Sequence, residues 1–196
     1  NVGIGTNSPG EALEVNGTIT ASSITTSGNL VVDGDINYSS GNEKTYYRTV
    51  PAQSFATRRL PTQDQEIVTD NANTPYRYFY GGSPFGYSYA DAAIYLPDGA
   101  VVDEVVGYLY NNDTVAFTVR GRLSRMDLAS GNKSTMATCQ TSSVINSVQV
   151  VNSAGIVNAQ IDNSSYSYFV EFEGRGHSSL TRIYAIRVRY TVTKPD

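Results

Sequence analysis

Hydrophobic and polar residues alternate along much of the C-terminal half of the chain. Residues 115–124 place Val, Phe, Val and Leu on one set of alternate positions and Thr, Arg, Arg and Ser on the other. Residues 166–173 and 184–192 alternate in the same way. A period of two is typical of a β-strand with one buried face. The residues predicted to face inward are Val115, Phe117, Val119, Leu123, Tyr166, Tyr168, Val170, Phe172, Tyr184, Ile186, Val188, Tyr190 and Val192.

Turn-forming residues separate these predicted strands. No segment has a sustained period of 3.6 residues, so we expect almost no helix. Long hairpins in a domain of this size favour a jelly-roll-like antiparallel β-sandwich over an immunoglobulin topology, although the order of the strands stays open. The predicted turns are Pro97-Asp-Gly99, Asn111-Asn-Asp113, Ser130-Gly-Asn132, Asp162-Asn-Ser164 and Gly174-Arg-Gly176.

The first 40 residues contain an internal repeat, in which Leu13-Glu-Val15-Asn-Gly17-Thr-Ile19 matches Leu30-Val-Val32-Asp-Gly34-Asp-Ile36. The apolar spacing within each copy predicts a strand with a kink at its glycine. One copy has too few apolar side chains to offset its own conformational entropy, so we expect three chains to share an axis. The alternative is a loose N-terminal tail. The predicted axis residues are Leu13, Val15, Ile19, Ile24, Leu30, Val32 and Ile36.

These residues carry a resemblance. Val2-Gly-Ile-Gly-Thr6-Asn-Ser-Pro9, followed by residues 13–19, resembles a segment that recurs in bacteriophage tail fibres and large bacterial surface proteins. In that group the segment is similar to trimeric fibre shafts, so the resemblance implies a homotrimer outside the cell, on a cell surface or a virion. The self-cleaving chaperone that often follows begins with Ser-Asp-x-Arg-x-Lys. Residues 1–196 contain no such start, so that activity is not carried over.

We predict three regions: a repetitive β shaft (1–40), a connector with the first short strands (41–75), and a β-sandwich tip (76–196). The connector is rich in Asn, Thr, Gln and Pro, with extended pieces near 45–50 and 65–69. Motifs of the tip, such as Leu96-Pro-Asp-Gly99, resemble a C-terminal β domain of uncharacterised role in bacterial secreted proteins. The chain begins without Met, so we expect it to be part of a longer polypeptide.

Composition supports a strand-rich binding or structural protein. The chain has 15 Tyr and 17 Gly, no Trp, only 16% charged residues, and a net charge of −4. No run of Lys or Arg could neutralise adjacent phosphates, which argues against nucleic acid as a partner. No apolar stretch approaches the roughly 20 residues that cross a bilayer, so we expect no membrane insertion. Cys139 is the single cysteine, which we interpret as an inert core or interface residue.

The segment from residue 76 to residue 89 is unusually aromatic and contains Gly and Pro. Its rings could stack on the apolar faces of sugars, while Arg77, Ser83 and Asp91 could bond sugar hydroxyls. The alternative is that the rings line an interface between subunits, where Tyr is also favoured. The candidate ligand-binding residues are Tyr76, Arg77, Tyr78, Tyr80, Phe85, Tyr87 and Tyr89.

Other candidate sites are weaker. His177 could serve a Ser-His-Asp triad, but nothing positions one, and a solvated turn explains it better. Residues 70–73 and 111–113 offer oxygen ligands for Ca²⁺ without the pattern of a dedicated loop, and turn chemistry explains both. We expect no metal and no cofactor.

Four arginines alternate on predicted strands: Arg120, Arg122, Arg187 and Arg189. They could form one basic face if their strands are neighbours. The alternative is cross-strand pairing with Glu171 or Glu173.

The sequence therefore favours a non-enzymatic tip of a trimeric fibre, an adhesin that binds a cell-surface glycan or another surface polymer. The second hypothesis is a structural module that trimerises and caps the shaft without a ligand of its own. An enzyme comes third, because a depolymerase needs paired carboxylates. Here Asp and Glu lie mostly in turns or alone on strand faces.

Overall fold

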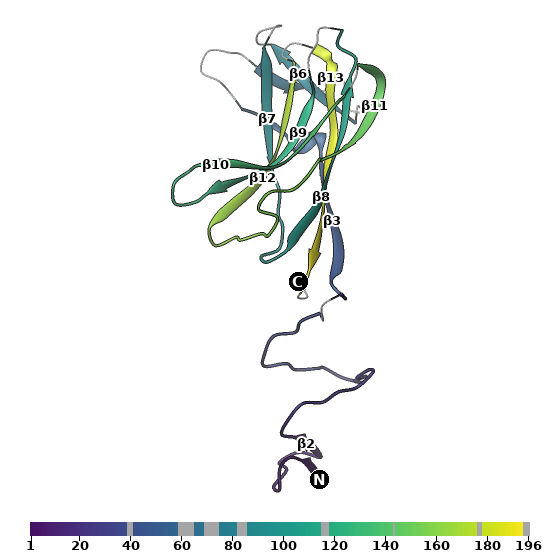
Figure 1. Ribbon diagram of the computed structural model, residues 1–196, viewed down its shortest axis with the longest axis vertical. Helices are drawn as coiled ribbons and strands as arrows, with labels where there is room; N and C mark the ends of the chain where they lie inside the picture. Colours follow the sequence, from purple (N-terminus) through teal and green to yellow (C-terminus); the bar gives the residue numbers. More distant parts are fainter. Residues whose placement is uncertain are drawn as a thin grey trace. The chain divides into compact units, whose positions relative to one another are not determined.

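The computed structural model describes residues 1–38, 41–58, 65–68, 75–81, 86–114, 118–142, 144–175 and 178–193. The chain forms two compact units, Asn1–Asp35 and Ile36–Asp196 (Figure 1).

A short parallel ladder organises the N-terminal unit. Strand β1 (Val2–Ile4) pairs with β2 (Leu13–Val15), and Val2 lies opposite Leu13. Backbone hydrogen bonds from Val2 to Ala12 and from Asn16 to Ile4 extend the ladder. Gly5 has a φ of 75°, and a Cβ atom there would lie 2.5 Å from the carbonyl oxygen of Asn16. Glycine is therefore required at this position of the Val-Gly-Ile-Gly-Thr motif.

The two copies of the repeat differ in structure. The first forms the predicted strand β2, but residues 30–36 contain no strand, so that part of the prediction is wrong for a single chain. The physical reason is that the second copy has no neighbouring strand to pair with. Val15 is half-buried, while the other predicted axis residues are exposed, as are Val2, Ile4 and Val31. The shared trimer axis stays a prediction.

The C-terminal unit is an antiparallel β-sandwich of the jelly-roll type, as predicted (Figure 1). One sheet has five strands in the order β10-β9-β12-β7-β4. Its strands are β4 (Ala56–Thr57), β7 (Tyr87–Ala93), β9 (Arg120–Asp127), β10 (Lys133–Gln140) and β12 (Tyr166–Arg175).

The other sheet has six strands, in the order β11-β8-β13-β6-β5 with β3 also paired to β13. Within the described ranges the only helical turn is the 3₁₀ turn η1 (Ala52–Ser54), and no helix there could cross a bilayer. The strands of this sheet are β3 (Lys44–Pro51), β5 (Gln65–Val68), β6 (Arg77–Gly81), β8 (Val101–Asn111), β11 (Ile145–Asn152) and β13 (Ser178–Val192).

The hydrophobic core lies between the two sheets. The predicted inward residues Val119, Val170, Phe172, Ile186 and Val188 are all buried in it. Val115 and Phe117 lie outside the described residues. Strands from the expected connector also contribute to this core.

Tyr184 corrects the prediction for the last strand. It was expected to face inward, but the pairing of β13 with β8 is irregular between Ile183 and Ala185, and Ile183 is the fully buried residue. Such a bulge adds one residue and exchanges the two faces locally. The predicted turn at residues 174–176 is also wrong in part, because Gly174 and Arg175 belong to β12.

Cys139 is buried, as predicted for a core residue, at a place where the backbone packs closely against it. Its thiol donates a hydrogen bond to the Gly121 carbonyl at 3.2 Å. A Cβ atom at Gly107 would lie 2.7 Å from the Cys139 sulfur, so a side chain there would displace it. Burial raises the pKa of the thiol to about 11, which keeps the unreactive protonated form at neutral pH.

Candidate functional site

The aromatic segment from residue 76 to residue 89 does not form one cluster. Tyr76, Tyr78 and Tyr80 lie on or beside β6 in the six-stranded sheet, whereas Tyr87 and Tyr89 lie on β7 in the five-stranded sheet. Phe79, between Tyr78 and Tyr80, is fully buried in the core, so these two tyrosines point to the outer face of their sheet.

Arg77, another member of that predicted set, is bonded within the protein. The Arg77 side chain donates a hydrogen bond to the backbone carbonyl of Phe55 at 2.9 Å. Phe85 lies outside the described residues, as does Ser83, which was expected to bond sugar hydroxyls. The segment therefore supplies rings to two different sheets instead of a single platform.

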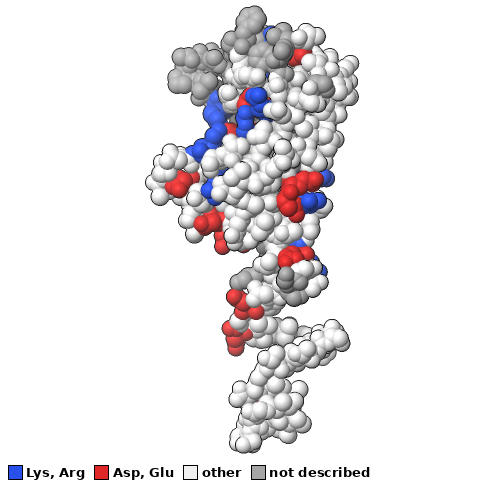
Figure 2. All heavy atoms as spheres, viewed as in Figure 1, with Lys and Arg blue, Asp and Glu red and all other residues white. Residues whose placement is uncertain are grey.

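Charged groups are concentrated on the outer face of the five-stranded sheet. Figure 2 shows Lys and Arg gathered beside acidic side chains on one side of the C-terminal unit. Glu171 and Glu173 are at alternate positions of β12 and face outward, because Val170 and Phe172 point into the core, and Asp91 comes from β7. We name this surface the ionic face and define it as Arg58, Tyr87, Tyr89, Asp91, Arg120, Arg122, Lys133, Glu171 and Glu173.

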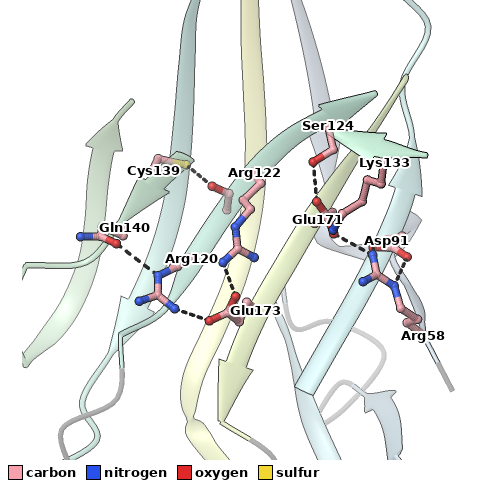
Figure 3. Close-up of polar contacts among 11 residues, drawn as sticks. Arg58, Asp91, Arg120, Arg122, Ser124, Lys133, Cys139, Gln140, Glu171 and Glu173 are labelled. Carbon is pink, nitrogen blue, oxygen red and sulfur yellow. Dashed lines mark hydrogen bonds and ion pairs between the residues drawn. The ribbon is translucent and has the colours of Figure 1, made fainter. Parts of the chain in front are cut away.

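Glu171 is the most buried charged group of the ionic face, with no exposed side-chain surface. Its Oε1 atom accepts hydrogen bonds from Arg58 at 2.7 Å and Lys133 at 2.8 Å, and its Oε2 atom accepts one from Ser124 (Figure 3). Burial alone would raise the pKa of Glu171. The hydrogen bonds from Lys133, Ser124 and Arg58 outweigh burial and lower that pKa, so the group is ionised at neutral pH.

Arg58 links Glu171 to a second carboxylate. Its Nε and Nη2 atoms donate to the two oxygens of Asp91 at 2.9 and 2.6 Å, a bidentate pair that fixes the plane of the guanidinium. The Tyr89 ring lies 5.7 Å from the same guanidinium. Burial, followed by the charge of Glu173, raises the pKa of Tyr89. The phenol is therefore a neutral hydrogen-bonding group at physiological pH.

Glu173 forms the second centre of the ionic face. One of its oxygens accepts a hydrogen bond from Arg120 and the other accepts one from Arg122 (Figure 3). Arg120 also donates to the Gln140 side chain at 3.2 Å, and its guanidinium lies 5.7 Å from the Tyr87 ring. Glu173 is 3% exposed, whereas the two guanidiniums are 28% and 19% exposed. The cations thus cover the acid and face the solvent themselves.

The arrangement corrects two expectations. Acidic side chains were expected mostly in turns or alone on strand faces, but Asp91, Glu171 and Glu173 gather on one face, where each is bound to cations. The prediction of a single basic face is wrong. Arg120 and Arg122 lie in the five-stranded sheet, whereas Arg187 and Arg189 lie in the six-stranded sheet.

Cross-strand pairing explains these arginines instead. Arg120 and Arg122 pair with Glu173, as the alternative predicted. Arg187 lies 3.7 Å from Glu104, and Arg189 lies 2.6 Å from Asp103, so these two find partners on β8 and not on β12.

The oxygen-rich segment at residues 111–113 is part of the packed structure. Both carboxylate oxygens of Asp113 accept hydrogen bonds from Arg175 at 2.7 Å, and the Asn111 amide donates to Thr141. In the described ranges no three His, Cys, Asp or Glu side chains are grouped to hold a metal ion. His177 and residues 70–73 lie outside those ranges.

No local pattern predicted the hollow beside Tyr95, just after β7. The hollow has a volume of about 460 Å³, and the Tyr95 side chain is 84% exposed. Leu128, Asn163 and Tyr166 line its other walls. Together with Tyr95, these residues come from three distant parts of the chain, so only the tertiary fold brings them together.

No protein-family model and no curated protein matches this chain. Among solved structures, it is similar to the CBM22-1–GH10 modules of Clostridium thermocellum endo-1,4-β-D-xylanase 10B complexed with xylohexaose, at 15% identity and a TM-score of 0.41. That match covers 75% of this chain and 27% of the other, so this chain spans only about a quarter of it. The CBM22-2 xylan-binding domain of Paenibacillus barcinonensis Xyn10C is similar at 12% identity and a TM-score of 0.44, over 74% of this chain and 99% of that one.

Proposed function

We propose that this chain is the non-enzymatic tip of a trimeric extracellular fibre, and that its ionic face binds a glycan or a similar polymer of a cell surface. The observation that carries the proposal is the set of guanidiniums held by buried carboxylates beside Tyr87 and Tyr89.

The chemistry of the ionic face suits a sugar. Sugar hydroxyls need donors and acceptors in fixed positions, and the apolar side of a sugar ring packs on an aromatic ring. Arg58 and Arg120 are held by carboxylates on their inner side, and their side chains are 35% and 28% exposed. Groups that are already fixed lose little conformational entropy when a ligand binds.

The charge balance favours a neutral or acidic polymer. Four cations (Arg58, Arg120, Arg122 and Lys133) face three carboxylates (Asp91, Glu171 and Glu173), which leaves the ionic face one positive charge in excess. The whole chain has a net charge of −4. That overall charge would attract a basic polymer from a distance, but the contacts on the ionic face itself would bring like charges together.

The state of the carboxylates supports a binding role over catalysis. Glycoside hydrolysis needs one carboxylic acid that keeps its proton near neutral pH. The pKa of Glu171 is lowered, and both oxygens of Glu173 accept hydrogen bonds from guanidiniums. Both groups are thus engaged as acceptors by cations, which supports a binding role.

The fibre part of the proposal rests on the N-terminal unit. Leu13, Ile19, Ile24 and Leu30 are each at least 59% exposed in the single chain, which is costly unless other copies cover them. Three tips on one shaft would raise the apparent affinity for a repetitive surface polymer through multivalency.

A structural cap without a ligand is the second candidate. It is favoured by the fact that Glu171 is completely buried and bonded by three partners, as in a network that serves only to stabilise the sheet.

Affinity electrophoresis through gels that contain neutral or acidic polysaccharides separates the two candidates. We expect at least one polysaccharide to retard the wild-type protein, and we expect Tyr87→Ala to reduce that retardation while Tyr95→Ala leaves it unchanged. Loss of retardation in Tyr95→Ala alone would move the site to the hollow beside Tyr95. A wild-type protein that no polysaccharide retards would favour the structural cap.

A further inference from the structure

Tyrosines are concentrated on the outer face of the six-stranded sheet. We name this surface the tyrosine face and define it by Tyr47, Tyr76, Tyr78, Tyr80, Tyr108, Tyr110 and Tyr184 together with Arg182, Arg187, Val148 and Val150. Nearly half of the 15 tyrosines of the chain are therefore on one surface.

Strand alternation and one bulge bring these rings to the same side. On β8, Tyr108 and Tyr110 flank Leu109, which is fully buried in the core and therefore points the opposite way. The bulge on β13 turns Tyr184 outward, where its ring lies 5.4 Å from the ring of Tyr76.

Two arginines lie among the rings. The Arg182 guanidinium is 4.2 Å from the Tyr76 ring and 4.5 Å from the Tyr110 ring, so it is held between two aromatic groups. Arg187 lies 5.2 Å from the Tyr47 ring and 5.9 Å from the Tyr108 ring. The same combination of ring and guanidinium thus occurs twice on one sheet.

Exposed aliphatic side chains extend this surface onto the edge strand β11. Val148 lies opposite Tyr110 and is 42% exposed, and Val150 lies opposite Tyr108 and is 62% exposed. Tyr47 and Tyr80 are 56% and 57% exposed. No described segment of the chain covers these side chains.

The composition and size of the tyrosine face fit a protein interface. Tyr and Arg are the residues most enriched at the energetic centres of interfaces. The sheet is five strands wide, because β3 and β6 pair with different parts of β13. Five strands about 4.8 Å apart and about 25 Å long cover roughly 600 Å². A stable interface buries about 800 Å² on each partner, so the face has nearly the area that one contact requires.

We propose that the tyrosine face packs against other copies of this chain and holds the sandwich units together in the assembly. A second copy fits for two reasons. The face presents both aromatic rings and guanidiniums, so it is complementary to itself. The N-terminal unit separately exposes apolar residues that suit self-association. The inference does not depend on glycan binding, which we assign to the opposite sheet.

The full chain offers a matched pair of variants. Val150 and Val157 are the same residue type and are both 62% exposed, but only Val150 lies on the tyrosine face. The background variant Ile19→Asp removes the contribution of the shaft to association. Sedimentation velocity then reports the mass of Ile19→Asp alone and in combination with Val150→Glu or Val157→Glu.

We expect Ile19→Asp alone to remain associated through the tyrosine face. Adding Val150→Glu should raise the dissociation constant by about tenfold or more, because it buries a charge at the contact, and adding Val157→Glu should leave it unchanged. Circular dichroism of each variant separates dissociation from unfolding. If Val150→Glu unfolds the sandwich, Tyr47→Ala gives the same comparison without a buried charge.

Three results would overturn the inference: a monomeric wild-type protein, a monomeric Ile19→Asp protein, or equal masses for the two glutamate variants. Loss of polysaccharide binding with unchanged mass would contradict the proposed function and leave this inference intact. Polysaccharide binding that is lost in Val150→Glu but not in Val157→Glu, at equal mass, would identify the tyrosine face as a glycan site and overturn the interface.

Discussion

The ring of Phe79 on β6 stacks on the ring of Phe172 on β12, with 4.9 Å between the centroids and 4° between the planes. This contact joins the two sheets through the centre of the core, where both side chains are fully buried. It also determines which way the tyrosines beside Phe79 point. With Phe79 fixed inward, Tyr78 and Tyr80 point away from the core. Tyr87 lies on β7, in the other sheet.

The first prediction concerns this contact. Replacing Phe172 with Ala should lower the free energy of unfolding by about 3–5 kcal/mol, because it removes the stacked ring and leaves a cavity between the sheets. The control is Phe169→Ala on the same strand, where the side chain is only half-buried. Denaturant unfolding of both variants measures the difference. Equal losses would mean that the assignment of inward and outward faces on β12 is inverted.

The second prediction concerns Glu171. Glu171→Gln should lower the free energy of unfolding at pH 7 by about 1–3 kcal/mol, because Arg58 and Lys133 lose a charged acceptor. Glu66→Gln, at an exposed position of β5, is the control and should change stability little.

The pH dependence of this effect has a definite sign. The pKa of Glu171 is lower in the folded protein than its ordinary value of about 4.3, so ionised Glu171 stabilises the fold above that pH. The contribution is lost as the pH falls through the folded pKa. The stability difference between wild type and Glu171→Gln should therefore shrink as the pH falls below about 4.3, the ordinary pKa of a glutamate. A difference that stays constant over that range would contradict the role given to this carboxylate.

The third prediction concerns the N-terminal unit. Ile19→Asp should make residues 1–40 sensitive to protease, since the charge would lie on the proposed shared axis. Thr18→Asp, one position away and also exposed, is the control for an added charge. Limited proteolysis followed by mass spectrometry locates the first cuts. Equal resistance of the two variants would refute the shared axis and favour a loose tail.

Local sequence patterns predicted much of the sandwich but not its exceptions. Alternation identified Val170 and Phe172 correctly because each strand buries one face against the other sheet. It failed at Tyr184, because a bulge depends on the pairing of β13 with β8 and not on the residues of β13 alone.

The ionic face shows why the candidate site was only partly predictable. Tyr87 and Tyr89 were named from the aromatic segment, but their charged neighbours come from elsewhere in the chain. Arg58 bonds Glu171 across a separation of 113 residues, and no local pattern reports such a contact. The contact between Arg58 and Glu171 depends on the order of the strands, which the sequence pattern did not determine.

The most direct measurement compares two matched double variants from the same aromatic segment. Tyr87→Ala/Tyr89→Ala removes two rings from the ionic face, and Tyr78→Ala/Tyr80→Ala removes two rings with the same spacing from the tyrosine face. Titration calorimetry with short fragments of a polysaccharide that retards the wild type measures the affinity of each binding site without multivalency. We predict that the first variant loses about tenfold or more in affinity at unchanged mass, while the second keeps its affinity. Unchanged affinity in a correctly assembled Tyr87→Ala/Tyr89→Ala protein would contradict glycan recognition by the ionic face.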